Sequence, residues 1–249
     1  MSRRNIPLLE ATGRVYLVTG AAGGLGRALL PVLRAGGAKI AACHVGPRET
    51  KETDADIRWF RMDARDEADV KATVQSVLDH YGRLDGVLHL GGIVGHGPLT
   101  EVSLEQWNNL LAVNLTSAFL LARETHGALK ASKGSLILLS STNGLNGGSA
   151  LSGPAYAVAK AGLINLTRYL AKEWMADGIR VNCVAPGPVA TPMLDRLSDN
   201  TIVSLQDMSL NGSFATADQV AALIAFLCSD HAGQTTGTVN NISAGLFLD

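Results

Sequence analysis

A tyrosine and a lysine one helical turn apart, Tyr156 and Lys160, are the residues whose spacing most directly suggests chemistry. Side chains at i and i+4 lie on the same face of a helix. An ammonium group held beside a phenol favours the phenolate, and can lower a tyrosine pKa from about 10 towards neutrality. Such a tyrosine could exchange a proton with an alcohol at working pH. The pair alone is a weak signal, because an aromatic residue and a solvated lysine share a helix face in many proteins.

A glycine-rich turn near the N-terminus lies between a strand pattern and a helix pattern. The apolar run 15–18 predicts a buried strand, and the residues that follow the glycines have the apolar period of a helix. This context favours a dinucleotide site. Gly20 would permit the tight turn, Gly24 would let the backbone approach a pyrophosphate, and Gly26 would let helix and strand pack closely. The helix N-terminus would present free N–H groups to the phosphates.

With both motifs in place, the chain resembles the short-chain dehydrogenase/reductase family in its single-domain form, from about Gly13 to Phe247. The family motifs occur in their usual order, and they are carried here by Thr19, Gly20, Gly24 and Gly26, then Asn114, then Ser140 and Ser141, then Tyr156 and Lys160, and finally Pro186 and Gly187 with Thr191.

The resemblance implies hydride transfer between NAD or NADP and a secondary alcohol or its ketone. Tyr156 would be the general acid/base, and Lys160 would lower the Tyr156 pKa and bind the nicotinamide ribose. Ser141 would hydrogen-bond the substrate oxygen. Asn114 would hold a water that links Lys160 to solvent. The cofactor-binding residues that the resemblance implies are Gly20, Gly24, Leu25, Gly26, His44, Asp63, Ala64, Gly91, Gly92, Tyr156, Lys160, Pro186, Gly187, Val189 and Thr191.

Alternating strand and helix patterns predict an α/β fold, a Rossmann-type three-layer doubly wound parallel sheet, in a single domain over 1–249. Strands are expected at 15–19, 39–43, 57–61, 86–90, 135–140, 180–184 and 238–242. Helices are expected near 25–35, 66–80, 104–130, 155–177 and 217–228. The least regular stretch, about 188–215, is expected to form a substrate lid beside the cofactor.

Three departures from the family pattern bear on the site. His89-Leu90-Gly91-Gly92 stands where the family usually has Asn-Asn-Ala-Gly. We interpret His89 as a core histidine that replaces one of the asparagine hydrogen bonds. The gap between Ser141 and Tyr156 is slightly longer than the family's commonest spacing, and the extra residues fall in the Gly- and Ser-rich segment 146–153.

The third departure concerns the choice of cofactor. His44 closes the second expected strand, where an acidic residue would bind the 2′-hydroxyl of NAD. A missing carboxylate removes the repulsion that excludes a 2′-phosphate. Gly23 stands at the position of the basic residue typical of many NADP enzymes, and Arg48 follows a few residues after His44. The cofactor is therefore NAD or NADP, with a slight lean to NADP.

The expected substrate rim combines apolar, hydroxyl and amide side chains: His96, Asn143, Leu145, Ser149, Met193, Leu194 and Leu197. This set contains neither an arginine clamp for a carboxylate nor an aromatic platform for a sugar. It favours a mid-sized hydroxy or keto compound. Two other functions stay open at this point: an epimerase or dehydratase with a retained cofactor, which the His89-Leu90-Gly91 segment suggests, and a non-catalytic dinucleotide sensor.

The composition argues against several classes of binding partner. The net charge of −1, without a basic stripe, argues against nucleic acid. The three cysteines are isolated in apolar runs, so we expect reduced core residues and no metal site. No apolar run reaches the roughly 20 residues of a membrane span. Ser2-Arg3-Arg4 is not followed by a long apolar segment, which argues against a secretory signal. A cytoplasmic location is expected.

The expected helices 104–130 and 155–177 have apolar residues over more than the single stripe that a core-facing helix requires. A second subunit is the natural cover for the surplus. The resemblance implies pairing of these two helices across a two-fold axis, and often tetramers built through the last strand near 238–242. We predict a homodimer or homotetramer.

Overall fold

The computed structural model describes residues 9–46 and 54–248. In these residues a seven-stranded sheet has the order β3-β2-β1-β4-β5-β6-β9, and every adjacent pair is parallel. The strands are β1 (Val15–Thr19), β2 (Lys39–His44), β3 (Ile57–Arg61), β4 (Gly86–His89), β5 (Ser135–Leu139), β6 (Arg180–Pro186) and β9 (Val239–Ile242). The predicted strands are confirmed, with small shifts at their ends. Arg48 and the segment Ser2-Arg3-Arg4 lie outside the described residues.

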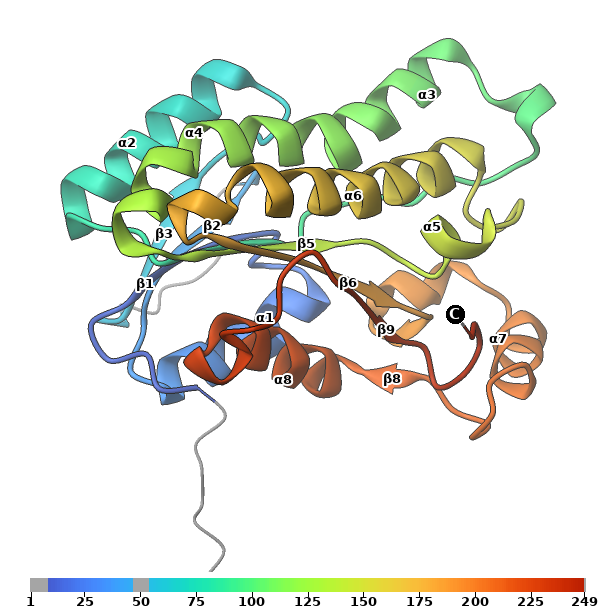
Figure 1. Ribbon diagram of the computed structural model, residues 1–249. Coiled ribbons are helices and arrows are strands. Elements are labelled where there is room, and N and C mark those ends of the chain that lie inside the picture. The colour runs from blue at the N-terminus through green and yellow to red at the C-terminus, as the bar shows by residue number, and fades with distance from the viewer. Residues whose placement is uncertain (1–8, 47–53, 249) are drawn as a thin grey trace, which may run out of the picture.

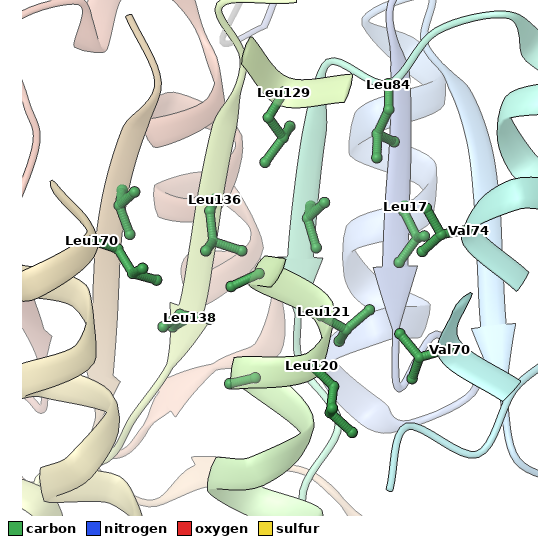
Figure 2. Close-up of a cluster of buried hydrophobic side chains, with 14 of the residues drawn as sticks. Leu17, Val70, Val74, Leu84, Leu120, Leu121, Leu129, Leu136, Leu138 and Leu170 are labelled. Carbon is green, nitrogen blue, oxygen red and sulfur yellow. The ribbon is translucent and has the colours of Figure 1, made fainter. Parts of the chain in front are cut away.

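Helices cover both faces of the sheet, as predicted (Figure 1). On one face lie α2 (Glu67–Tyr81), α4 (Ser117–Ser132) and α6 (Pro154–Glu173), and on the other lie α1 (Gly24–Ala35) and α8 (Ala217–Cys228). Figure 2 shows leucine and valine side chains of the first face meeting between strands and helices. Every residue of β1 is buried. Burial on both faces explains why this strand is a continuous apolar run without alternation.

The helix expected at 104–130 is made of three pieces. They are α3 (Leu104–Leu111), a π-helical turn (Ala112–Thr116), here called the π-turn, and α4. Apolar spacing cannot reveal such a turn, because the widened turn adds one residue without interrupting the apolar face. π-turns occur frequently at functional sites.

The segment 188–215 is more regular than expected. It contains β7 (Val189–Ala190), a short 3-10 helix (Pro192–Arg196), α7 (Asp199–Asp207) and β8 (Ala215–Thr216). β7 and β8 pair in parallel, which holds the two ends of the segment together, and α7 projects beyond the sheet (Figure 1). The remaining short elements are α5 (Asn143–Asn146) and 3-10 turns at Leu99–Glu101, Met175–Asp177 and Asp230–Ala232.

The strand order reverses between β1 and β4, which are neighbours in the sheet although β2 and β3 lie between them in sequence. In open parallel sheets a crevice forms at this point, outside the carboxyl ends of the strands. The segments that follow β1, β4, β5 and β6 carry, in this order, the glycine turn, Asn114 on the π-turn, Ser141 with Tyr156 and Lys160 of α6, and Gly187 with Thr191. The topology therefore brings these segments to one edge of the sheet.

Candidate active site

A cavity of about 1370 Å³ opens at the carboxyl ends of the central strands. The structure places every predicted cofactor-binding residue in its wall, and Ser141 with them. Asn114 lies just behind the wall and is fully buried. The cavity continues under the segment 188–215, so a bound cofactor and a substrate would share one space.

The glycine turn needs glycine for three different reasons. Gly20 has a φ of +64°, and a Cβ there would lie 2.8 Å from the amide nitrogen of Gly91. A Cβ at Gly26 would lie 2.5 Å from the carbonyl oxygens inside the turn, and one at Gly24 would lie 2.9 Å from Cβ of Thr191. Gly24 thus also makes room for the segment after β6. Because Gly23 caps α1 without a side-chain bond, the first N–H groups of α1 can bind phosphate oxygens.

At the adenosine end, β2 ends at His44 as predicted. Asp63 accepts hydrogen bonds from Arg65 Nε at 2.9 Å and Nη2 at 2.6 Å. This contact lowers the pKa of the Asp63 carboxyl, and the guanidinium offsets its charge. Asp63 is the one carboxylate that lines the cavity within 9–46 and 54–248. Arg65 was missed by the sequence analysis, although an arginine two residues after the acid was the available signal.

The predicted catalytic residues converge where β5 meets α6. Tyr156 and Lys160 lie on α6, and Lys160 Nζ is 5.3 Å from the centroid of the Tyr156 ring. Lys160 Nζ donates to Leu139 O at 2.7 Å, and Ser140 Oγ donates to Lys160 O at 2.7 Å. These two bonds fasten the middle of α6 to the end of β5. They hold Ser141 next to the phenol.

Burial raises the pKa of Tyr156, while the nearby Ser141 hydroxyl and the charge of Arg196 lower it. The lowering of the Tyr156 pKa by Lys160 stays a prediction. The Lys160 ammonium is directed to Leu139 O, and its own burial lowers the pKa of Lys160 to about 8. With a pKa of about 8, Lys160 is still mostly protonated at neutral pH, so its ammonium remains a positive charge near the Tyr156 ring.

Asn114 sits on the π-turn with only half of its amide satisfied. Its Nδ2 donates to Ile93 O at 2.9 Å and to Leu110 O at 3.0 Å. Its Oδ1 is buried and makes no hydrogen bond with the described part of the chain. A Cβ on Gly92 would lie 2.7 Å from this oxygen and 3.4 Å from Lys160 Nζ. A free acceptor and an ammonium therefore flank Gly92, which is the donor and acceptor set that a bridging water requires.

His89 makes two hydrogen bonds, where the sequence analysis expected one. Nδ1 lies 2.8 Å from Thr19 Oγ1, and Nε2 lies 2.9 Å from Ser117 Oγ. Burial, together with the charge of Lys160, lowers the pKa of His89 to about 3. The ring is therefore neutral at working pH.

The substrate end of the cavity differs in part from the expected rim. Asn143, Ser149, Met193, Leu194 and Leu197 line it, whereas His96 and Leu145 do not. Further lining residues at this end include Asn146, Gly148, Leu151, Ser152, Arg196, Leu205, Met208 and Leu246.

The sequence predicted a rim without an arginine, but Arg196 lies in it. Arg196 Nη1 donates to Leu151 O at 2.6 Å, so it joins the segment 188–215 to the loop before α6. The apolar residues on both sides of this bond make the outer wall of the cavity largely hydrophobic.

The three cysteines are buried, and burial raises the pKa of Cys43 to about 12, so its thiol stays protonated. None of the helices described is both long enough and apolar enough to cross a membrane.

Comparison with known proteins agrees with this geometry. The family described as enoyl-(acyl carrier protein) reductase matches residues 20–246. The chain is 32% identical over 243 residues to the 3-oxoacyl-[acyl-carrier-protein] reductase FabG of Escherichia coli, covering 95% of this chain and 98% of that protein. It is 31% identical to the acetoacetyl-CoA reductase of an Acinetobacter strain, covering 94% and 98%. The crystal structure of a short-chain dehydrogenase/reductase, glucose/ribitol dehydrogenase, from Brucella melitensis superposes with a TM-score of 0.89 at 27% identity, covering 97% and 99%.

The chain belongs to the short-chain dehydrogenase/reductase family. It is an NAD(P)-dependent oxidoreductase of the alcohol dehydrogenase/ketoreductase type, which transfers hydride between the nicotinamide cofactor and a secondary alcohol or its ketone. The epimerase or dehydratase alternative and the sensor alternative are not favoured, because these relatives are named as reductases.

The buried neutral state of His89 predicts a loss of stability in acid. Its pKa is about 3 in the folded protein and about 6.5 in an unfolded chain, so between these values the unfolded chain binds the extra proton. The free energy of unfolding should therefore fall as the pH drops below about 6.5, by roughly 2 kcal/mol between pH 7 and pH 5 from this group. Urea unfolding at both pH values should show a smaller loss in His89→Asn than in the wild type. Equal losses would contradict the assignment.

Proposed function

We propose that the protein reduces a 3-oxoacyl thioester, or a ketone of similar size, with NADPH as the preferred cofactor. The observation that carries the proposal is the single cavity in which the tyrosine–lysine pair meets a largely apolar outer wall. The wall residues Met193, Leu194, Leu205 and Met208 suit an acyl chain, because contact with them removes apolar surface from water. Two relatives at 31–32% identity are named for 3-oxoacyl and acetoacetyl substrates.

Each catalytic side chain has a separate role in ketone reduction. A nicotinamide bound in this cavity would supply the hydride that the carbonyl carbon accepts. Tyr156 gives its proton to the carbonyl oxygen, and Ser141 donates a hydrogen bond to the same oxygen as negative charge develops there. Lys160 holds the nicotinamide ribose, and Asn114 binds a water that returns a proton from solvent towards Tyr156. Hydride and proton together convert the ketone into a secondary alcohol.

The segment 188–215 acts as a substrate lid in this proposal. Its two ends are held by the β7–β8 pair, while α7 between them has no buried residue. The bond from Arg196 to Leu151 O is the contact that would open and close at the outer rim. A segment fixed at its ends and loosely packed in its middle can move without disturbing the sheet.

The preference for NADPH rests on charge at the adenosine end. Arg27, His44 and Arg65 line this part of the cavity, and the carboxylate of Asp63 is offset by Arg65. No uncompensated carboxylate among the described residues would repel a 2′-phosphate there. Asp63 would still accept a hydrogen bond from the adenine amino group through its carboxylate.

Tyr156→Phe tests the catalytic assignment with an acetoacetyl thioester and NADPH. The variant should fold and bind cofactor nearly as the wild type does, while kcat falls by about 10²- to 10⁴-fold, because only the transferable proton is lost. Lys160→Ala should lower both kcat and cofactor affinity. Nicotinamide absorbance measures turnover, and fluorescence titration measures cofactor binding. Normal turnover in Tyr156→Phe would end the proposal.

His44→Asp tests the cofactor preference. A carboxylate at the end of β2 should repel the 2′-phosphate and lower the NADPH/NADH ratio of kcat/KM by at least about tenfold. His44→Asn is the matched control, because it changes the side chain without adding charge. An unchanged ratio in His44→Asp would show that the 2′-phosphate does not lie at His44.

We also propose a cytoplasmic homodimer or homotetramer that is paired through α4 and α6. A shallow apolar groove crosses these helices, lined by Leu115, Thr116, Phe119, Gly162, Asn165, Leu166 and Tyr169. Phe119 is 47% exposed and Tyr169 is 62% exposed, which is unusual for two large aromatic side chains that line one groove. A two-fold axis across this groove would cover both faces at once.

Light scattering at micromolar concentration should therefore give a mass at least twice 26.0 kDa. Phe119→Glu should shift the mass towards the monomer, because it places a charge in the centre of the groove. Val203→Glu is the control, since Val203 is an exposed apolar residue on α7, away from the groove. A monomeric wild type, or equal shifts in both variants, would refute the interface.

A further inference from the structure

His89 joins three elements of the fold through a ring that is 1% exposed. It closes β4, and its two nitrogens meet Thr19 at the end of β1 and Ser117 at the start of α4. A buried imidazole needs a partner at each nitrogen, and here the partners come from different elements. The residue is therefore a cross-link and does more than fill space in the core.

The hydrogen bonds around His89 have a fixed direction. The Ser117 hydroxyl donates its proton to Val113 O at 2.7 Å, so its oxygen is left to accept from His89 Nε2–H. At the other nitrogen, Thr19 Oγ1 accepts from the Gly91 N–H at 3.2 Å and donates to His89 Nδ1. When the neutral ring carries its proton on Nε2, each donor in this series, from the Gly91 N–H to the Ser117 hydroxyl, has an acceptor.

This series of hydrogen bonds runs from the Gly91 N–H to Val113 O, and its two ends lie at the two halves of the candidate site. Gly91 is packed against the glycine turn, since a Cβ on Gly20 would lie 2.8 Å from its nitrogen. At the other end, the Ser117 N–H donates to Ala112 O, five residues back, as the π-turn requires. The Ser117 hydroxyl serves Val113 O, the carbonyl that a regular α-helix would pair with the Ser117 amide.

We propose that His89 is a positioning residue, which holds the π-turn and Asn114 on it in register with the glycine turn. The inference rests on the proposed roles of Asn114 and Lys160. Asn114 Oδ1 and Lys160 Nζ both lie beside Gly92, at 2.7 Å and 3.4 Å from the point where a Cβ on that residue would stand. A shift of the π-turn would move the oxygen away from the ammonium, and a misplacement of 1 Å at a catalytic centre can cost about 10²-fold in rate.

Ser117→Ala tests this series of hydrogen bonds, and Thr125→Val is its matched control. Both hydroxyls are fully buried on α4, and both donate to the carbonyl four residues back, Thr125 Oγ1 to Leu121 O at 2.7 Å. Only Ser117 also meets His89. A loss that comes merely from a missing helix hydroxyl should therefore be equal in the two variants.

We expect kcat to fall by about tenfold to 10²-fold in Ser117→Ala, with KM for the cofactor within about twofold of the wild type. The solvent deuterium isotope effect on kcat should rise, because a displaced Asn114 slows proton return. Thr125→Val should change neither quantity. His89→Leu should behave as Ser117→Ala, and His89→Gln, which keeps a donor towards Ser117, should recover part of the loss.

Hydrogen exchange gives a readout that does not depend on turnover. In Ser117→Ala the amides of 112–118 should exchange faster than in Thr125→Val, while the rest of α4 stays protected. Equal exchange in the two variants, or unchanged kcat and isotope effect in Ser117→Ala, would overturn the positioning role. If Tyr156→Phe retained its activity, the proposed catalytic set would fail, and the exchange comparison alone would still decide the role of His89.

Discussion

The buried ammonium of Lys160 is the constraint on which the rest of the site depends. Taking a charge out of water costs several kcal/mol unless hydrogen bonds replace the lost hydration. No carboxylate lies among the groups that shift the pKa of Lys160, so the chain supplies dipoles: the carbonyl of Leu139 directly, and the oxygen of Asn114 across Gly92. The end of β5 and the π-turn must both stand close to α6 for this to happen. The site is therefore as rigid as the packing of these elements.

Close packing also explains why glycines gather around the cofactor cavity. Gly20, Gly26 and Gly92 each lie where a Cβ would meet main-chain or functional atoms at less than 3.0 Å. The three positions bring β1, α1, β4 and the π-turn within direct contact of one another. A side chain at any of them would separate elements whose loops must share one crevice.

Contacts within the same fold compensate for the departures from the family pattern. A histidine in place of an asparagine at 89 keeps the link between β1, β4 and α4, because its two ring nitrogens reach both neighbours. At the adenosine end, Arg65 offsets the charge of Asp63, while His44 leaves the end of β2 without a carboxylate. These changes leave the reaction class as it is and alter how the cofactor pocket is charged.

The sequence by itself determined the parallel sheet, its seven strands and most of the residues that line the cavity, because buried strands and glycine turns leave short-range patterns. It could not show the π-turn, since apolar spacing is the same on either side of it, nor α7, whose helix has no buried face. Tertiary structure alone decided which hydroxyls the two nitrogens of His89 meet, where Arg196 reaches, and that burial raises the pKa of Tyr156 more than Ser141 and Arg196 lower it. Each of these depends on groups far apart in the chain, whose distances and burial exist only once the chain has folded.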